Sequence, residues 1–308
     1  MRRFRPDPRG TRIANPNVMH WRNQWRVVVL VLAVVSLPSF AFAQADQPPP
    51  PQPPQIDQTV INVPTTLPLK AHHSYFRLTH RFVRDLRRGS FGQLAEDLFS
   101  LDSGAIIALE YRFGLTSNLQ AGVHRSILNK TIQTFGRWDA FAQETGHPIG
   151  LSIGGSVEGT NNMQQDYQPG VSATVSRTHR GWLALYASPA YVHHAHTTTL
   201  LELHEGHSHD TAGGEDPDAQ LDKRNTVFIG LGTRIRFLPS AFFVGEVSPR
   251  LAGYTPDRAA WNVGVEKMTH GHVLQLNFGN NNATTPGMIA RGGDKHNVFM
   301  GFNLTRKF

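Results

Sequence analysis

From His73 to the C-terminus, apolar and polar residues alternate with a period of two in many short segments. The clearest case is residues 226–237, where Val227, Ile229, Leu231, Ile235 and Phe237 alternate with Thr226, Gly230, Gly232, Arg234 and Arg236. Because successive side chains of a β-strand point to opposite faces, each such segment has one apolar and one polar face. Strands of about ten residues with one lipid-compatible face and one wet face are typical of transmembrane barrels.

Twelve segments follow this pattern, and an even number is expected for a single-chain bacterial barrel. They are residues 73–84, 104–113, 119–128, 131–142, 149–158, 170–178, 182–193, 223–237, 241–250, 260–268, 272–279 and 297–308. The helical spacing of Leu94, Ala95, Leu98 and Phe99 predicts one helix over 91–101. No apolar stretch after residue 72 reaches 18 residues. We therefore predict an all-β fold, a closed antiparallel up-and-down transmembrane barrel of about 12 strands.

The connections between these segments alternate in length. The second, sixth, eighth and tenth are short: residues 114–118, 179–181, 238–240 and 269–271. The first, fifth, seventh, ninth and eleventh are longer: residues 85–103, 159–169, 194–222, 251–259 and 280–296. The third, near Asn129 and Lys130, is short against the pattern, and the fourth, residues 143–148, is intermediate. Outer-membrane barrels have short periplasmic turns and long extracellular loops, so this parity predicts that residues 194–222 face the outside.

The N-terminus resembles a secretory signal peptide. Arg22 and Arg26 precede the apolar run Val27–Val35, and Ala41-Phe42-Ala43 gives a small-x-small exit. We expect residues 1–43 to be a cleaved signal peptide, which implies export from the cytoplasm. Together with the predicted barrel, this indicates the bacterial outer membrane. Residues 44–71 contain Pro48–Pro51, Pro53 and Pro54 and are expected to form a Pro-rich linker. The barrel is predicted to cover residues 72–308.

Removing the leader changes the charge. The whole chain has 30 basic and 23 acidic residues, of which residues 1–43 hold seven arginines and one aspartate. The remaining chain carries +1, so the basic isoelectric point is no sign of nucleic-acid binding, and we expect no nucleic-acid partner. The absence of cysteine excludes disulfides, thiolate metal sites and cysteine nucleophiles.

The chain ends in a barrel-like strand. Met300, Phe302, Leu304 and Phe308 have the spacing of one strand face and finish on a terminal phenylalanine. This resembles the C-terminal signal that the barrel-assembly machinery reads in outer-membrane proteins, although Arg306 departs from it. We therefore expect two partners, outer-membrane lipid and the assembly machinery, the latter through the strand ending at Phe308.

Short motifs in residues 72–140 resemble the DUF5777-like outer-membrane β-barrel family. They are His80-Arg81-Phe82, Leu101-Asp102-Ser103-Gly104-Ala105, Tyr111-Arg112-Phe113-Gly114-Leu115-Thr116, Gly122-Val123-His124-Arg125-Ser126 and Lys130-Thr131. They correspond to the family's THRF-like start, its LD-x-GA segment and its GV-x-RS-x3-KT segment. The resemblance implies an outer-membrane barrel and no established activity.

The seventh connection carries the densest candidate chemistry. The candidate metal ligands are His193, His194, His196, His204, His207, His209 and Asp210. Imidazole and carboxylate are the usual ligands of zinc, copper and nickel where thiolate is absent. We expect no cofactor beyond weak binding of Zn, Cu or Ni; the alternative is a solvated polar loop without a ligand.

Charged residues at strand positions form a second candidate site. Arg77, Arg81, Arg234, Arg236, Glu246 and Glu266 are predicted to line the lumen. Charge on the lipid face costs about 2–4 kcal/mol at the bilayer midplane, which favours the interior. Arg112 and Arg125 break the strict alternation and are expected near the membrane interfaces. The lumen residues either line a pore that favours anions or neutralise one another in a plugged barrel.

No enzyme motif stands out, since no G-x-S-x-G, H-E-x-x-H or P-loop is present. We predict a non-enzymatic, porin-like barrel that passes or binds small polar or ionic solutes. One alternative is a structural or anchoring barrel without transport. A second is a barrel lipid hydrolase using His124 and Ser126, which lie two apart on one strand face.

Overall fold

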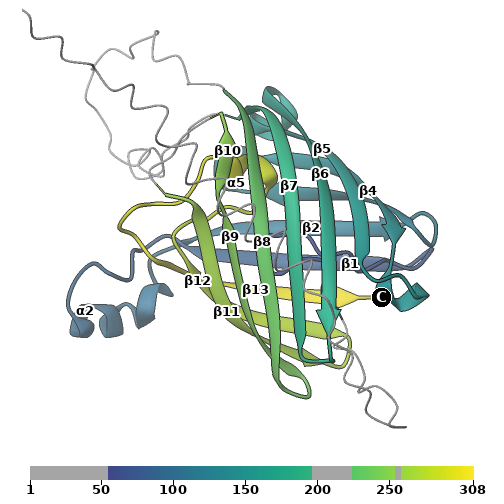
Figure 1. Ribbon diagram of the computed structural model, residues 1–308. Helices are drawn as coiled ribbons and strands as arrows, with labels where there is room; N and C mark the ends of the chain where they lie inside the picture. The colour runs from purple at the N-terminus through teal and green to yellow at the C-terminus, as the bar shows by residue number, and fades with distance from the viewer. Residues whose placement is uncertain (1–54, 196–223, 254–257) are drawn as a thin grey trace, which may run out of the picture. The chain divides into compact units, whose positions relative to one another are not determined.

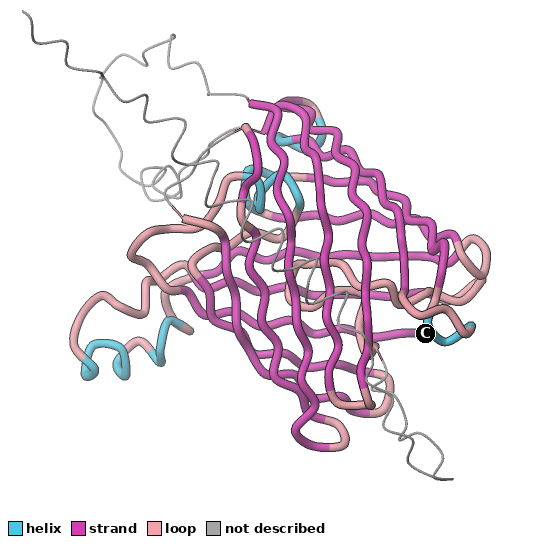
Figure 2. Tube along the Cα trace, viewed as in Figure 1, coloured by secondary structure: helices cyan, strands magenta, loops and turns pink. Residues whose placement is uncertain are grey.

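The computed structural model describes residues 55–195, 224–253 and 258–308. The strands are β1 Ser74–Phe82, β2 Ala105–Gly114, β3 Leu119–Ser126, β4 Ile132–Phe141, β5 Gly150–Gly159, β6 Gln165–His179, β7 Leu183–Ala195, β8 Arg224–Leu238, β9 Ala241–Ser248, β10 Arg250–Ala252, β11 Ala260–Thr269, β12 His272–Gly279 and β13 Phe299–Lys307. The helices in the described residues are α2 Phe91–Glu96, α3 Thr160–Met163 and α5 Pro286–Ala290, with single 3₁₀ turns at Leu98–Ser100, Leu128–Lys130 and Gln143–Thr145. Helix is confined to the connections, as Figure 2 shows.

The strands form one closed antiparallel barrel. Apart from the short β10, each strand pairs with the next along the chain, with β9 pairing with β8 and β11. β1 pairs with β13, so the sheet closes (Figure 1). β10 continues the direction of β9 beyond Pro249 and also pairs with β8, so the barrel has twelve strands. The prediction of a closed barrel of about twelve strands is confirmed, and closure satisfies the backbone hydrogen bonds that lipid cannot.

The two faces of the wall differ as the alternation predicts. In β8, Ile235 and Phe237 are 36% and 44% exposed, whereas Thr226, Phe228 and Arg234 on the other face are buried. In β2, Ile107, Leu109 and Tyr111 point outward, and Glu110 and Arg112 point inward. The outer surface is therefore apolar and the lumen polar, the reverse of a water-soluble barrel.

Some element boundaries differ from the predicted ones. β6 begins at Gln165, five residues earlier than expected. It has 15 residues, more than the roughly ten that cross the membrane, and its extra residues extend toward the β5–β6 connection. The predicted helix 91–101 is α2, capped by Ser90, followed by a 3₁₀ turn. The α-helix ends at Glu96, five residues earlier than predicted, and Phe99 in the following turn has φ of 55°, which is not helical. In the described residues, no helix is long and apolar enough to cross a membrane.

The longest described connections, β1–β2 and β12–β13, lie at one end of the barrel, here called the outer end, together with the short connections β3–β4 and β5–β6. The other end, here called the inner end, carries the turns β2–β3, β4–β5, β6–β7, β8–β9 and β11–β12, of which the β4–β5 turn is the longest. The outer end carries α2, α3 and α5. The segment joining β7 to β8, residues 196–223, lies outside the described residues.

Candidate functional site

The lumen of the inner half is occupied by the chain's own N-terminal segment. Residues 55–70, here called the luminal hairpin, turn back at 60–63, where Val60 N–H donates to the Val63 carbonyl at 2.8 Å, and Thr59 and Pro64 form a β-bridge. Most of these residues are buried. Residues 44–71 were expected to be a linker; the described part of that segment instead packs against the barrel wall.

One carboxylate holds the tip of the hairpin. Glu246 in β9 accepts the backbone N–H groups of Ile61, Asn62 and Val63 at 3.1, 2.7 and 2.8 Å. Its other oxygen accepts from the side chain of Asn262 at 2.9 Å. Hydrogen bonds to a charged acceptor are stronger than neutral ones, so Glu246 is the main anchor of the tip.

Two glycines of β8 make room for the tip. A Cβ placed on Gly230 would lie 2.9 Å from Val63 Cγ2, and one placed on Gly232 would lie 2.9 Å from Val60 Cγ2. Both positions face the lumen, and Gly232 stands opposite Glu246 in the β8–β9 register. Any side chain at these positions would therefore overlap the hairpin.

Arginines from different strands donate to the hairpin's carbonyl oxygens. Arg77 in β1 donates to Ile61, Arg234 in β8 to Thr59 at 3.0 Å, and Arg137 in β4 to Thr65 at 3.0 Å and to Leu67. Gln275 in β12 donates to the Val60 carbonyl at 2.6 Å. The wall thus binds the hairpin from several sides through polar groups.

Apolar contacts and one aspartate also attach the hairpin to the barrel wall. Val60, Ile61 and Val63 pack with Ala184, Tyr186 and Val244 in one buried cluster. Nearer the inner end, Asp57 accepts from the Tyr75 hydroxyl at 2.7 Å and from Thr305 at 3.3 Å.

A second insertion fills part of the outer half. Residues 280–291, here called the inner loop, connect β12 to β13 and carry α5. Glu158 in β5 accepts from Thr285 and from the Gly287 N–H, both at 3.1 Å, and Arg250 donates to the carbonyls of Ile289 and Ala290, both at 2.9 Å. Met288, Ile289 and Ala290 join a buried cluster with wall residues that include Ile106, Val192 and Phe228. The inner loop is therefore fixed by charge at both ends of α5 and by apolar packing.

Of the residues predicted to line the lumen, Arg77, Arg81, Arg234, Glu246 and Glu266 are buried on the interior face. Arg234 and Glu266 form a two-point ion pair at 2.7 and 3.1 Å. Arg236 is half-buried near the inner end, over the ring of Phe242.

Besides Glu158 and Arg250, four charged residues of β2 and β4 lie in the lumen and were not predicted to line it. Arg112 was expected near an interface, but it lies inside and pairs with Glu110 at 2.5 Å, while Arg137 pairs with Asp139 at 2.9 Å. All four occupy alternate, inward positions of β2 and β4, which strict application of the alternation would have found.

The candidate hydrolase pair does not face lipid. His124 and Ser126 are 2% and 0% exposed and lie on the interior face of β3. Ser126 accepts from the Leu128 N–H at 3.2 Å, and no hydrogen bond joins it to His124 among the described residues. This arrangement does not bring a nucleophile to the bilayer, so it gives no support to lipid hydrolysis.

Only two of the seven predicted metal ligands fall within the described residues. His193 and His194 lie just before Ala195, the last residue of β7, with ring centroids 3.7 Å apart. His196, His204, His207, His209 and Asp210 lie outside the described residues. In the described segments no group of three or more possible ligands gathers. Metal binding by this loop stays a prediction.

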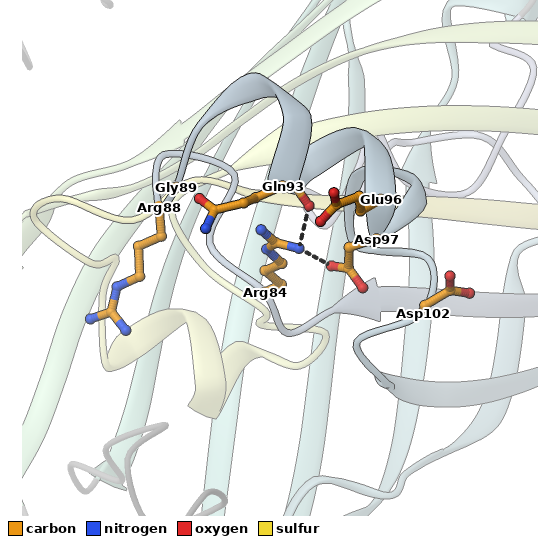
Figure 3. Close-up of a pocket in the computed structure, with 7 residues that line it drawn as sticks. All are labelled: Arg84, Arg88, Gly89, Gln93, Glu96, Asp97 and Asp102. Atoms are coloured by element: carbon orange, nitrogen blue, oxygen red, sulfur yellow. Dashed lines mark hydrogen bonds and ion pairs between the residues drawn. The ribbon is translucent and has the colours of Figure 1, made fainter.

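A cleft beside α2 lies on the first outer connection (Figure 3). Arg84, Arg88, Gly89, Gln93, Glu96, Asp97 and Asp102 line it. Arg84 donates to the Gln93 carbonyl at 3.2 Å and to Asp97. Hydrogen bonds from Ser103 and Arg84 lower the pKa of Asp97. The basic and acidic groups at the centre of the cleft therefore bind each other and fold the loop.

A closed barrel with an apolar outer face and a polar, occupied lumen defines a membrane-spanning β-barrel of the outer-membrane type. Residues 57–308 match the family described as "Membrane bound beta barrel domain (DUF5777)", and the chain belongs to that family. This confirms the resemblance found in the sequence and includes most of the hairpin in the family's domain. No curated protein matches the sequence.

Several solved outer-membrane barrels resemble the structure at low sequence identity. A NanC porin is 8% identical, with a TM-score of 0.46 over 77% of this chain and 98% of its own. The COG4313 outer membrane channel from Pseudomonas putida F1 is 12% identical, with a TM-score of 0.47 over 78% and 97%. Outer membrane phospholipase A from Escherichia coli is 10% identical, with a TM-score of 0.36 over 78% and 90%.

Proposed function

We propose that the protein is an outer-membrane channel for small polar or ionic solutes, closed in this structure by the luminal hairpin. The observation that carries the proposal is the way the hairpin is attached. Among the described residues, it joins the barrel only through residues 71–73, ahead of β1, and contributes no strand to the wall. It can therefore leave the lumen without breaking any pairing between strands.

The wall that the hairpin covers is suited to water. It presents Arg77, Arg137, Arg234, Glu246 and Gln275, whose contacts with the hairpin are hydrogen bonds that water can replace. A barrel that serves only as an anchor needs no such surface under a detachable segment. The inner loop differs, since strands hold it at both ends and apolar contacts pack it, so it narrows the channel permanently.

Removal of the Glu246 carboxylate tests this function. In Glu246→Ala, the backbone donors at the tip lose their charged acceptor, and each such bond contributes about 1.5–3 kcal/mol. We expect the open probability of single channels in planar bilayers to rise at least about tenfold over the unsubstituted protein, which corresponds to about 1.4 kcal/mol.

Glu96→Ala is the matched control, because it removes an exposed carboxylate on α2 and leaves the lumen intact. Its open probability should equal that of the unsubstituted protein. If folded Glu246→Ala shows no unitary steps at any voltage, the protein is a barrel without transport, and the anchoring alternative replaces the channel.

The sequence-based expectations about partners form part of the same proposal. β13 closes the barrel by pairing with β1 and β12, and Phe308 follows it with 57% of its surface exposed, which suits recognition by the assembly machinery. The apolar outer face suits outer-membrane lipid. Export through a cleaved leader and weak binding of Zn, Cu or Ni by the histidine-rich segment also remain proposals, and no enzymatic activity is proposed.

A further inference from the structure

Two fully buried arginines of β1 lack the acidic partner that three buried arginines of other strands have. Arg112, Arg137 and Arg234 each pair with a carboxylate. Arg77 and Arg81 lie four residues apart on the inward face of β1 and are only 3% and 1% exposed. In the described segments, neither has a carboxylate within ion-pair distance. Buried cations without a counterion are costly, so their positions need another explanation.

The tip of the hairpin substitutes for a counterion. Arg77 donates to the Ile61 carbonyl, and Arg81 donates to the Asn62 side-chain oxygen at 3.3 Å and to Asn303 at 2.9 Å. The Nε atoms of both arginines have no hydrogen-bond partner among the described residues. The Ile61 carbonyl oxygen and the Asn62 side-chain oxygen thus occupy the position of a counterion. An anion at the same position would neutralise both guanidinium groups, which these two neutral oxygens cannot do.

We propose that Arg77 and Arg81 form an oxyanion-binding site in the open lumen, for solutes that bear a carboxylate or phosphate group, and that the hairpin tip occupies this site when the channel is closed. The inference rests on the proposed channel function and names its substrate class. Planar guanidinium groups bind carboxylate and phosphate oxygens in pairs, a geometry that neither chloride nor lysine reproduces.

Withdrawal of the hairpin also shifts the charge of this region. Asp57 leaves with the hairpin, while Arg77 and Arg81 stay on the wall, so the region around the two arginines becomes more positive. The anion and the hairpin then compete for the same donors. Because an anion binds only the open state, it stabilises that state by mass action.

The site is tested in the Gly232→Leu background, in which the channel is expected to stand open. Current is recorded across a KCl gradient, with acetate or inorganic phosphate added as the probe. We expect a reversal potential on the anion-selective side and a chloride current that either probe reduces. Arg77→Gln/Arg81→Gln should weaken that block about tenfold or more, since bonds to charged groups are lost.

Two further variants separate geometry from charge. Arg77→Lys/Arg81→Lys keeps both charges, so anion selectivity should persist while the block by either probe weakens. Arg87→Gln/Arg88→Gln removes two exposed charges from the outer rim and should change neither property. Block by phosphate but not acetate would assign the site to phosphate-bearing solutes, and the reverse to carboxylates.

Failure of the channel proposal and failure of the oxyanion site give different results in these recordings. Absence of conductance in the folded Gly232→Leu protein overturns the channel and this transport site with it. A conducting protein whose selectivity and block are unchanged in Arg77→Gln/Arg81→Gln overturns the oxyanion site and leaves the channel in place.

Discussion

Replacement of Gly232 by leucine is expected to open the barrel. A Cβ at this position already lies 2.9 Å from Val60 Cγ2 and 3.5 Å from Val60 Cβ, and the rest of the leucine side chain extends further into the hairpin. Overpacking of this kind costs about 1–3 kcal/mol. That cost falls on the closed state alone, which corresponds to a shift of about 5- to 150-fold toward the open one. Planar bilayers should show unitary steps where the unsubstituted protein is mostly silent.

Gly155→Leu is the matched control for this experiment. Gly155 lies on the outward face of β5, and a Cβ there meets nothing within 4 Å. It adds the same bulk on the lipid side, so conductance should stay at the level of the unsubstituted protein. Equal conductance in the two leucine variants would mean that the hairpin does not govern the opening.

Removal of the Arg234 guanidinium is expected to be the most destabilising single substitution in the wall. Arg234 and Glu266 are 1% and 0% exposed at their side chains and form a two-point ion pair. Arg234 also donates to the Tyr186 hydroxyl at 3.1 Å and to the Thr59 carbonyl. Arg234→Met leaves Glu266 charged and unpaired in the interior, which costs about 3–5 kcal/mol. Urea unfolding in lipid vesicles should show the loss as a lower free energy of unfolding.

The double variant Arg234→Met/Glu266→Gln separates charge from packing. It removes the stranded carboxylate, and we expect it to recover most of the lost stability. Arg306→Met serves as the surface control, since Arg306 is exposed at the end of β13, and should stay within about 0.5 kcal/mol. If Arg234→Met unfolds at the same denaturant concentration as the unsubstituted protein, the ion pair does not stabilise the barrel.

The barrel wall was predictable because its signal is local. In β8 and β12, the alternation depends only on which face of the strand contacts lipid. Each strand can therefore be predicted from its own residues. The same rule places Arg112 in the lumen, although it was expected near a membrane interface because it broke the strict alternation. Its partner, Glu110, lies two residues before it on the same face, so the pair was readable in the sequence.

The occupied lumen was not predictable in the same way. Residues 55–70 do not alternate, and they follow a proline tract that favours a linker. One signal was present, since Ile56, Val60, Ile61 and Val63 form an apolar cluster that a solvated linker does not need. Their partners, such as Glu246 and Ala184, lie more than 100 residues away in the chain, and only closure of the barrel brings them together.

The inner loop was likewise treated only as a long outer connection. Its apolar residues Met288, Ile289 and Ala290 are unusual for an exposed loop, but no local pattern says that they fold inward. Their placement depends on Glu158 and Arg250 from other strands.

The central claim is that the hairpin sits in the lumen and closes it, and a disulfide tests this most directly. The natural chain has no cysteine, and the Cβ positions of residues 60 and 232 are 3.5 Å apart, within the range of about 3.5–4.5 Å that disulfides span. In Val60→Cys/Gly232→Cys, we predict that the oxidised protein forms this bond and shows no unitary steps in planar bilayers, and that a reductant makes the steps appear. An oxidised, cross-linked protein that conducts as well as the reduced one would contradict the account.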